Sequence, residues 1–380
     1  MSILKQLNTW PISNSHIFIV LSGLLFVSIN VDAGEKGQNI LSNYSFGADI
    51  HYGYVIAHHP EMWALTDGYF PSYEFSLLKQ TNGKRAWQYL YRYPQIGISY
   101  RISNFGGSNY LGREHSLEPF IIFPIVKNEK FQLGFKTGLG VGYLSKKFDR
   151  LENYKNLAIG SHFNASISFE LKCRFKLGER VFLNAGISMA HLSNGTVKTP
   201  NYGLNIPTIF TGLTFKLNTK PVKYLVPDSI PYNKWKKNFR MMFWAASKQI
   251  DQNWNNQYMV YVLTADFSQY YCNSNRYLIG LDLIYDESVK YALELEGEKI
   301  ENNKETIKLG LNLGHEFVLD KLSLYFALGY YIYSIDTTKG KIYDKIAVNY
   351  TITRNLMIGV ALSAHYAQAD YLSVGIGFNL

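Results

Sequence analysis

A histidine and a serine stand two residues apart near the end of one alternating segment, residues 181–195. Side chains of a strand point to opposite faces in turn, so His191 and Ser193 share a face with every second residue before them. Those preceding residues are all apolar: Val181, Leu183, Ala185, Ile187 and Met189. A serine becomes a nucleophile when a base takes its proton, and an imidazole two residues away on the same face can reach the hydroxyl. The pair therefore predicts nucleophilic chemistry on an apolar substrate.

Long alternating segments recur along the chain and predict the strands that position the pair. Apolar and polar residues alternate through residues 163–175, and residues 131–143, 322–332 and 371–380 repeat the pattern. Such runs exceed the usual strand length of about 5–6 residues and match the roughly 9–11 residues of a strand that crosses a bilayer. Membrane barrels turn the apolar face outward. We therefore expect an all-β, transmembrane antiparallel β-barrel; the alternative is a secreted soluble β-sandwich, in which repeated long two-faced strands are rare.

The alternation predicts about sixteen strands in two groups of eight. The segment between the groups contains three prolines and mixed charge, as a connector does. We expect two eight-stranded units, and the alternative is one larger barrel of about 14–16 strands. The expected boundaries are 1–33 for a signal peptide, 34–217 for the first barrel, 218–237 for the connector and 238–380 for the second barrel.

The N-terminal segment has the pattern of a secretory signal peptide. Lys5 precedes an apolar core at residues 16–27, and small residues around Ala33 mark the expected cleavage site. The body of the chain has no run of 18 apolar residues, which disfavours membrane-spanning helices. The two cysteines, Cys173 and Cys272, are expected to be free, and no histidine–cysteine spacing indicates a metal. We predict an exported protein that needs neither a metal nor another cofactor.

The block His191-Leu192-Ser193-Asn194-Gly195, followed by Pro200-Asn201-Tyr202-Gly203-Leu204-Asn205, resembles the lipid A 3-O-deacylase family of outer-membrane barrels. The match is local to residues 191–205, extends weakly over the first unit and does not obviously cover the second. The resemblance implies hydrolysis of an acyl ester of lipid A, with lipopolysaccharide and outer-membrane lipids as partners. It also implies the outer membrane of a Gram-negative bacterium as the location.

The resemblance further implies the roles of individual residues. Ser193 would be the nucleophile, His191 the general base, and Asn194 would stabilise the oxyanion. The family's orienting glutamate falls on Asn205, which can hold the imidazole by a hydrogen bond but offers no charge. Other acids near strand ends could serve instead: Glu61, Asp67 and Glu118.

Two features qualify this reading. Residues 355–366 parallel the His–Ser strand, but Ala364 and Tyr366 stand at the two site positions, so the second unit lacks the pair. The alternative function is a non-catalytic porin-like or surface-interaction barrel, in which His191 and Ser193 belong to an interfacial girdle. A water-filled lumen would favour it, and a filled narrow lumen would oppose it.

Other features of the sequence are less specific. The adjacent His58 and His59 are expected to lie in a polar loop. The net charge of +9 suits an anionic lipid, and no motif indicates nucleic-acid binding.

Overall fold

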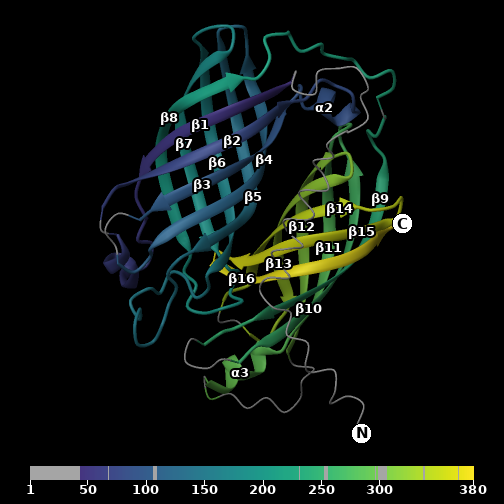
Figure 1. The fold of residues 1–380 in the computed structure, drawn as a ribbon. Helices are drawn as coiled ribbons and strands as arrows, with labels where there is room; N and C mark the ends of the chain where they lie inside the picture. Colours follow the sequence, from purple (N-terminus) through teal and green to yellow (C-terminus); the bar gives the residue numbers. More distant parts are fainter. Residues whose placement is uncertain are drawn as a thin grey trace.

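Two closed antiparallel barrels of eight strands each make up the computed structural model (Figure 1). It describes residues 43–66, 68–105, 109–230, 232–251, 256–295, 297, 306–336, 339–366 and 368–380. The expected signal peptide and its cleavage site at Ala33 lie outside these residues. The all-β prediction with two eight-stranded units is confirmed, and the single larger barrel is wrong because each sheet closes on its own first strand.

The first barrel closes where β1 pairs with β8. A short 3-10 helix follows β1 and a short α-helix follows β2. The elements are β1 (Tyr44–Gly53), η2 (Pro60–Leu65), β2 (Phe70–Gln80), α2 (Ala86–Leu90), β3 (Gln95–Asn104), β4 (Arg113–Lys127), β5 (Phe131–Leu144), β6 (Phe163–Lys176), β7 (Val181–Ser193) and β8 (Leu204–Lys216).

The second barrel closes where β16 pairs with β9. Its elements are β9 (Lys237–Lys248), β10 (Tyr258–Tyr270), β11 (Asn275–Asp286), α3 (Ser288–Leu295), β12 (Ile307–Leu319), β13 (Leu322–Tyr333), β14 (Ile342–Thr351), β15 (Leu356–His365) and β16 (Gln368–Asn379). Among the described residues, no helix combines the length and the apolar character needed to cross a membrane.

Both barrels are apolar outside and polar inside. In β6 of the first barrel, Phe169 and Leu171 are 42% and 40% exposed, whereas Glu170 between them is 1% exposed. Buried ion pairs cross each lumen, such as Arg101–Glu114 in the first barrel and Lys345–Asp282 in the second. Eight strands enclose only enough space for side chains to fill. The filled lumens disfavour the porin-like alternative.

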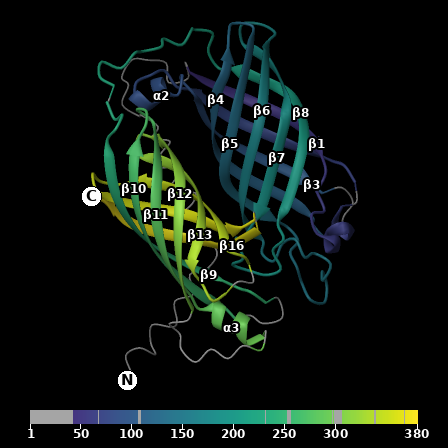
Figure 2. The ribbon, with the colours of Figure 1, turned by 180° about the vertical axis from the view of Figure 1, so that it is seen from behind.

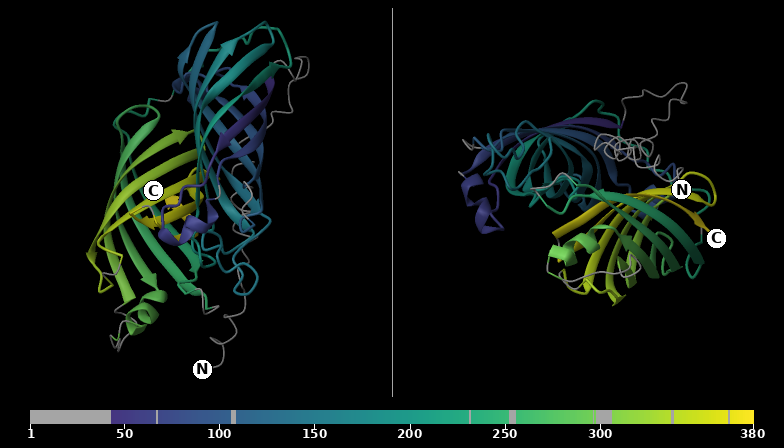
Figure 3. Two further views of the ribbon diagram at one scale, coloured as in Figure 1. Left: turned by 90° about the vertical axis from the view of Figure 1, so that its left-hand side faces the viewer. Right: turned by 90° about the horizontal axis from the view of Figure 1, so that it is seen from below.

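The barrels lie side by side, joined by the connector at one end and approaching each other along their walls (Figures 1 and 3). Leu372 of β16 and Val360 of β15 form an apolar cluster that includes Leu139, Val141 and Ala165 of the first barrel. Because β8 leads into the connector, the end of β7 and the start of β8 lie at the opposite end of the first barrel. Figure 2 shows the two antiparallel strands side by side.

Candidate active site

His191 and Ser193 end the outer face of β7. Ile187 and Met189 on the same face are 59% and 39% exposed, while the neighbouring Ala190 and Leu192 are buried on the inner face. His191 is half-buried, and Ser193, opposite Ala165 of β6, is 8% exposed. The pair thus lies outside the lumen, at the end of the barrel away from the connector.

Asn205 lies directly opposite His191 in the β7–β8 ladder. Its Oδ1 is 2.7 Å from Nδ1 of His191. Because an amide oxygen can only accept, Nδ1 carries the proton in this contact and Nε2 is left as the basic nitrogen. Because β8 begins at Leu204, Asn205 is already within the strand and stands in register with His191.

The Ser193 hydroxyl oxygen accepts two hydrogen bonds from the loop that follows β7. The backbone N–H of Gly195 donates at 3.2 Å, and Nδ2 of Asn201 donates at 2.9 Å. Neither of these bonds is to His191. Catalytic hydrogen bonds are often long before substrate binds, and the shared face keeps the imidazole and the hydroxyl on one side of the wall.

Asn194 faces the other way, which corrects its expected role as oxyanion donor. The side chain is fully buried, and its two N–H groups donate to Ser161 Oγ and to the carbonyl of Lys198, both at 3.0 Å. An amide has only two such donors. Strand alternation turns Asn194 inward from the Ser193 face, so the side chain holds the loop and has no donor left for a substrate.

Asn201 and His58 reach the site without having been singled out for it by the sequence. Nδ2 of Asn205 lies 3.4 Å from Nδ1 of His58, and Nε2 of His58 lies 3.0 Å from the carbonyl oxygen of Tyr202. The ring of His59 stacks on Tyr202 at 4.2 Å between centroids. In the sequence, the adjacent histidines and the Pro-Asn-Tyr-Gly turn could have drawn attention to these residues. Only the fold brings the loop after β1 and the loop before β8 together.

None of the three alternative acids is seen to support His191. Glu118 lies in the lumen, where it accepts hydrogen bonds from Arg101, Ser166 and Ser168. Glu61 is exposed on η2, and Asp67 lies outside the described residues. Within the described part of the chain, the side-chain hydrogen bond of His191 is the one to Asn205.

The second barrel holds the loop that carries the Ser193 partners. Thr196 Oγ1 donates to the carbonyl of Asp370, and the N–H of Gln249 donates to the carbonyl of Thr196 at 2.8 Å. Gln249 Oε1 accepts from the N–H of Thr199 at 3.0 Å, and Gln257 donates to the carbonyl of Val197 at 3.1 Å. Although it lacks the pair, the second barrel therefore helps to fix the loop conformation.

A groove lies on the outer wall of the first barrel, on the same side of the wall as the pair. Its cavity volume is about 590 Å³. Its walls are mostly apolar and aromatic, and they include Tyr52, Tyr54, Tyr69, Phe135, Phe169, Ile187, Met189, Pro207 and Ile209. Met189, which lines the groove, stands two residues before His191 on the outer face of β7. We name it the outer groove.

Among its described residues, the second barrel has no counterpart of the His191–Ser193 pair. Its seventh strand, β15, ends at His365, which is buried in the lumen and lies 3.1 Å from the Tyr331 hydroxyl. The outward positions that correspond to the pair are Ala364 and Tyr366, as expected from the sequence.

A family model matches each half of the chain. Residues 71–214 match the family model "Lipid A 3-O-deacylase (PagL)", and residues 237–380 match "Acyloxyacyl hydrolase, C-terminal domain". No curated protein matches the chain.

Solved structures of outer-membrane barrels also resemble it. Neisserial surface protein A is 11% identical over 46% of this chain and 97% of that one, with a TM-score of 0.33. The outer membrane enzyme PagL is 16% identical over 45% of this chain and 99% of that one, with a TM-score of 0.32. The chain thus consists of two closed eight-stranded barrels, the first similar to the lipid A 3-O-deacylase family and the second to the acyloxyacyl hydrolase C-terminal domain.

Proposed function

We propose that the first barrel is a serine esterase that removes an ester-linked acyl chain from lipid A in the outer leaflet of the outer membrane. The observation that carries the proposal is the 2.7 Å contact between His191 and Asn205 on the outer face, with the Ser193 hydroxyl two residues further along the same face. An oriented imidazole beside a hydroxyl is the arrangement that activates a serine.

The residues divide the reaction between them. Nε2 of His191 takes the proton of Ser193 as Oγ attacks the acyl carbonyl carbon, and Asn205 holds the ring through Nδ1. The resulting oxyanion is stabilised by the N–H of Gly195 and the amide of Asn201, both of which already donate to Ser193 Oγ. His191 then gives its proton to the sugar oxygen as the bond between that oxygen and the acyl carbon breaks, and the sugar leaves with a free hydroxyl. A water, activated in the same way, releases the fatty acid and restores Ser193.

The surroundings suit a lipid substrate. If the mature N-terminus begins in the periplasm, odd-numbered strands run outward and β7 ends at the cell surface. The ester would then lie at the interface while the acyl chain lies along the outer groove. The competing function is a surface-interaction barrel without catalysis, in which the same residues form part of an interfacial girdle.

The test is the mass spectrum of lipid A from Gram-negative cells that carry wild type, Ser193→Ala or His191→Ala. We expect wild type alone to remove the mass of one acyl chain. Ser188→Ala is the matched control, because Ser188 lies on the inner face of the same strand. If wild type and both variants give identical spectra, while all fold and reach the outer membrane, the proposed function fails.

A further inference from the structure

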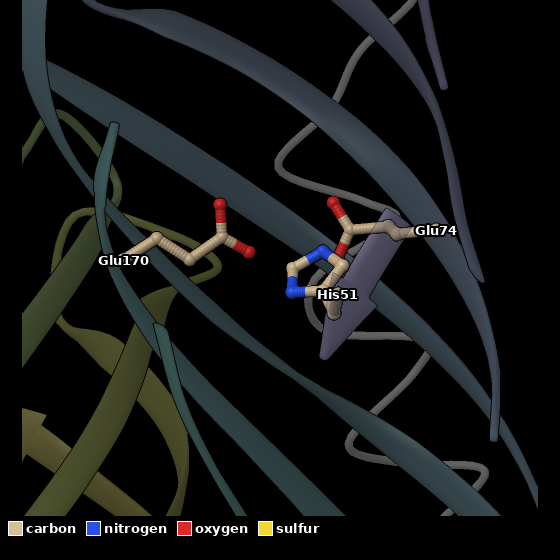
Figure 4. A group of neighbouring side chains, drawn as sticks. All are labelled: His51, Glu74 and Glu170. Atoms are coloured by element: carbon tan, nitrogen blue, oxygen red, sulfur yellow. The ribbon is translucent and has the colours of Figure 1, made fainter. Parts of the chain in front are cut away.

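Three side chains from three strands of the first barrel converge inside its lumen: His51 of β1, Glu74 of β2 and Glu170 of β6 (Figure 4). Each is about 1% exposed. One imidazole nitrogen and one oxygen from each carboxylate all lie within 4.8 Å of one another. The cluster is separate from the His191–Ser193 pair, which lies on the outer face of the wall.

In each of the three side chains, one polar atom has a hydrogen-bond partner and a second polar atom has none. His51 Nδ1 lies 3.0 Å from the Thr208 hydroxyl, while Lys136 Nζ donates to Glu74 Oε1 at 2.5 Å and to Glu170 Oε1 at 2.8 Å. His51 Nε2, Glu74 Oε2 and Glu170 Oε2 are buried and have no hydrogen-bond partner. Buried polar atoms are nearly always satisfied, so three unsatisfied atoms in one place indicate a ligand.

The charges of the first lumen also leave room for a cation. Among the described residues, its fully buried carboxylates outnumber its fully buried cations by two: Asp49, Glu74, Glu114, Glu118 and Glu170 against Arg101, Lys136 and Lys172. Arg174, nearer the mouth, is only half-buried and donates to Gln132. Uncompensated charge in a medium of low polarity is strongly unfavourable. With Arg174 counted, one carboxylate still lacks a cation, and a bound cation would offset that charge.

The second lumen provides a comparison within the same chain. Its fully buried carboxylates, within the residues described, are Asp266, Asp282, Asp286, Glu316, Asp336 and Asp370, and its fully buried cations are Arg240, Lys248, Arg276, Lys308 and Lys345. Lys339 reaches in from a more exposed position and donates to Asp370 at 2.6 Å. When the partly exposed cation of each lumen is counted, Lys339 here and Arg174 in the first, the second lumen is balanced and the first keeps an excess of one carboxylate.

We propose that His51, Glu74 and Glu170 bind one divalent metal ion, with Zn²⁺ as the best fit. Imidazole and carboxylate ligands suit Zn²⁺, which takes bonds of about 2.0–2.2 Å and accepts a water as fourth ligand. Ligand atoms around such an ion lie about 3.4 Å apart, so the three atoms, now within 4.8 Å of one another, need to close by up to about 1.4 Å. The Thr208 hydroxyl fixes the imidazole from behind, and Lys136 fixes both carboxylates.

The ion would have a structural role. It would tie β1 and β2 to β6 across the lumen and offset the excess negative charge there. The competing occupant is a pair of protons, one on the imidazole and one on a carboxylate, which would give the same net charge. The two occupants differ in metal content and in response to a chelator.

The test is metal analysis of the full-length protein, extracted from membranes in detergent and dialysed against micromolar Zn²⁺ and then against metal-free buffer. We expect about one Zn²⁺ per wild-type chain, and much less in His51→Gln and in Glu74→Gln. His365→Gln is the control, because it removes a luminal histidine of the second barrel and keeps the cluster. A chelator should lower the Tm of wild type and leave that of His51→Gln unchanged.

Cobalt provides a second measurement that does not depend on the stability of the variants. Co²⁺ added to metal-free wild type should produce the visible absorption of a tetrahedral site, and excess Zn²⁺ should remove it. Wild type that binds neither metal, with a Tm indifferent to chelator, overturns the proposal in favour of protons. Neither result bears on the esterase proposal, because the cluster faces the lumen.

Discussion

Gly195, two residues past the proposed nucleophile, packs directly against Leu372 of the second barrel. A Cβ at Gly195 would lie 2.7 Å from Cβ of Leu372, closer than real carbon contacts allow. The φ angle of Gly195 is +61°, in the left-handed region that favours glycine. The backbone N–H that donates to Ser193 is therefore positioned where the two barrels meet.

The first prediction follows from that contact. Gly195→Val should lower kcat at least about tenfold, because the new side chain must displace either the loop or β16 and so moves an N–H directed at Ser193. Gly178→Val is the control, since a side chain at Gly178 meets nothing within 4 Å. Hydrolysis of a soluble ester by the purified proteins measures the effect, and equal kcat values for both variants would contradict the proposed role of the loop.

Asn205 carries the second prediction. Asn205→Glu should raise kcat, because a carboxylate opposite His191 would stabilise the imidazolium that forms as the serine loses its proton. Asn205→Leu should lower kcat by about 100-fold, since nothing would then orient the ring. The measurement is kcat as a function of pH for the three proteins. A faster Leu variant, or no gain with Glu, would point to another orienting residue.

Asn201 carries the third prediction, with Asn194 as its contrast. Asn201→Ala should lower kcat by about 10²–10³ with little change in KM, as expected when an oxyanion donor is lost. Asn194→Ala removes hydrogen bonds to Ser161 and Lys198 and should act mainly on stability. Steady-state kinetics and thermal unfolding together separate the two effects. If Asn194→Ala gives the larger fall in kcat at unchanged Tm, the oxyanion assignment returns to Asn194.

The fourth prediction concerns the outer groove. Ile187→Trp should fill part of it and raise KM for esters with long acyl chains while leaving short-chain esters unaffected, because only long chains extend past Met189. Ile279→Trp, on the exposed outer face of the second barrel, is the control. The measurement is KM against acyl length. A uniform change across all lengths would mean that the chain lies elsewhere.

The sequence alone determined which residues form strands and which face each side chain takes, because side-chain alternation is a local property of an extended chain. It indicated two groups of eight strands, and it placed His191 and Ser193 on the outer face of β7. It could also have placed Glu118 inside, since that residue alternates with outward-facing Leu117 in β4. Alternation distinguishes the two faces without any knowledge of strand partners.

Only the tertiary structure decided which residues meet. The β7–β8 register sets Asn205 against His191, and the paths of two loops bring Asn201 to Ser193 and His58 to Asn205. Closure of the first barrel brings Glu170 of β6 to His51 and Glu74, which lie on the neighbouring strands β1 and β2. These contacts depend on strand register and barrel closure, which join residues through space and leave no spacing pattern along the sequence.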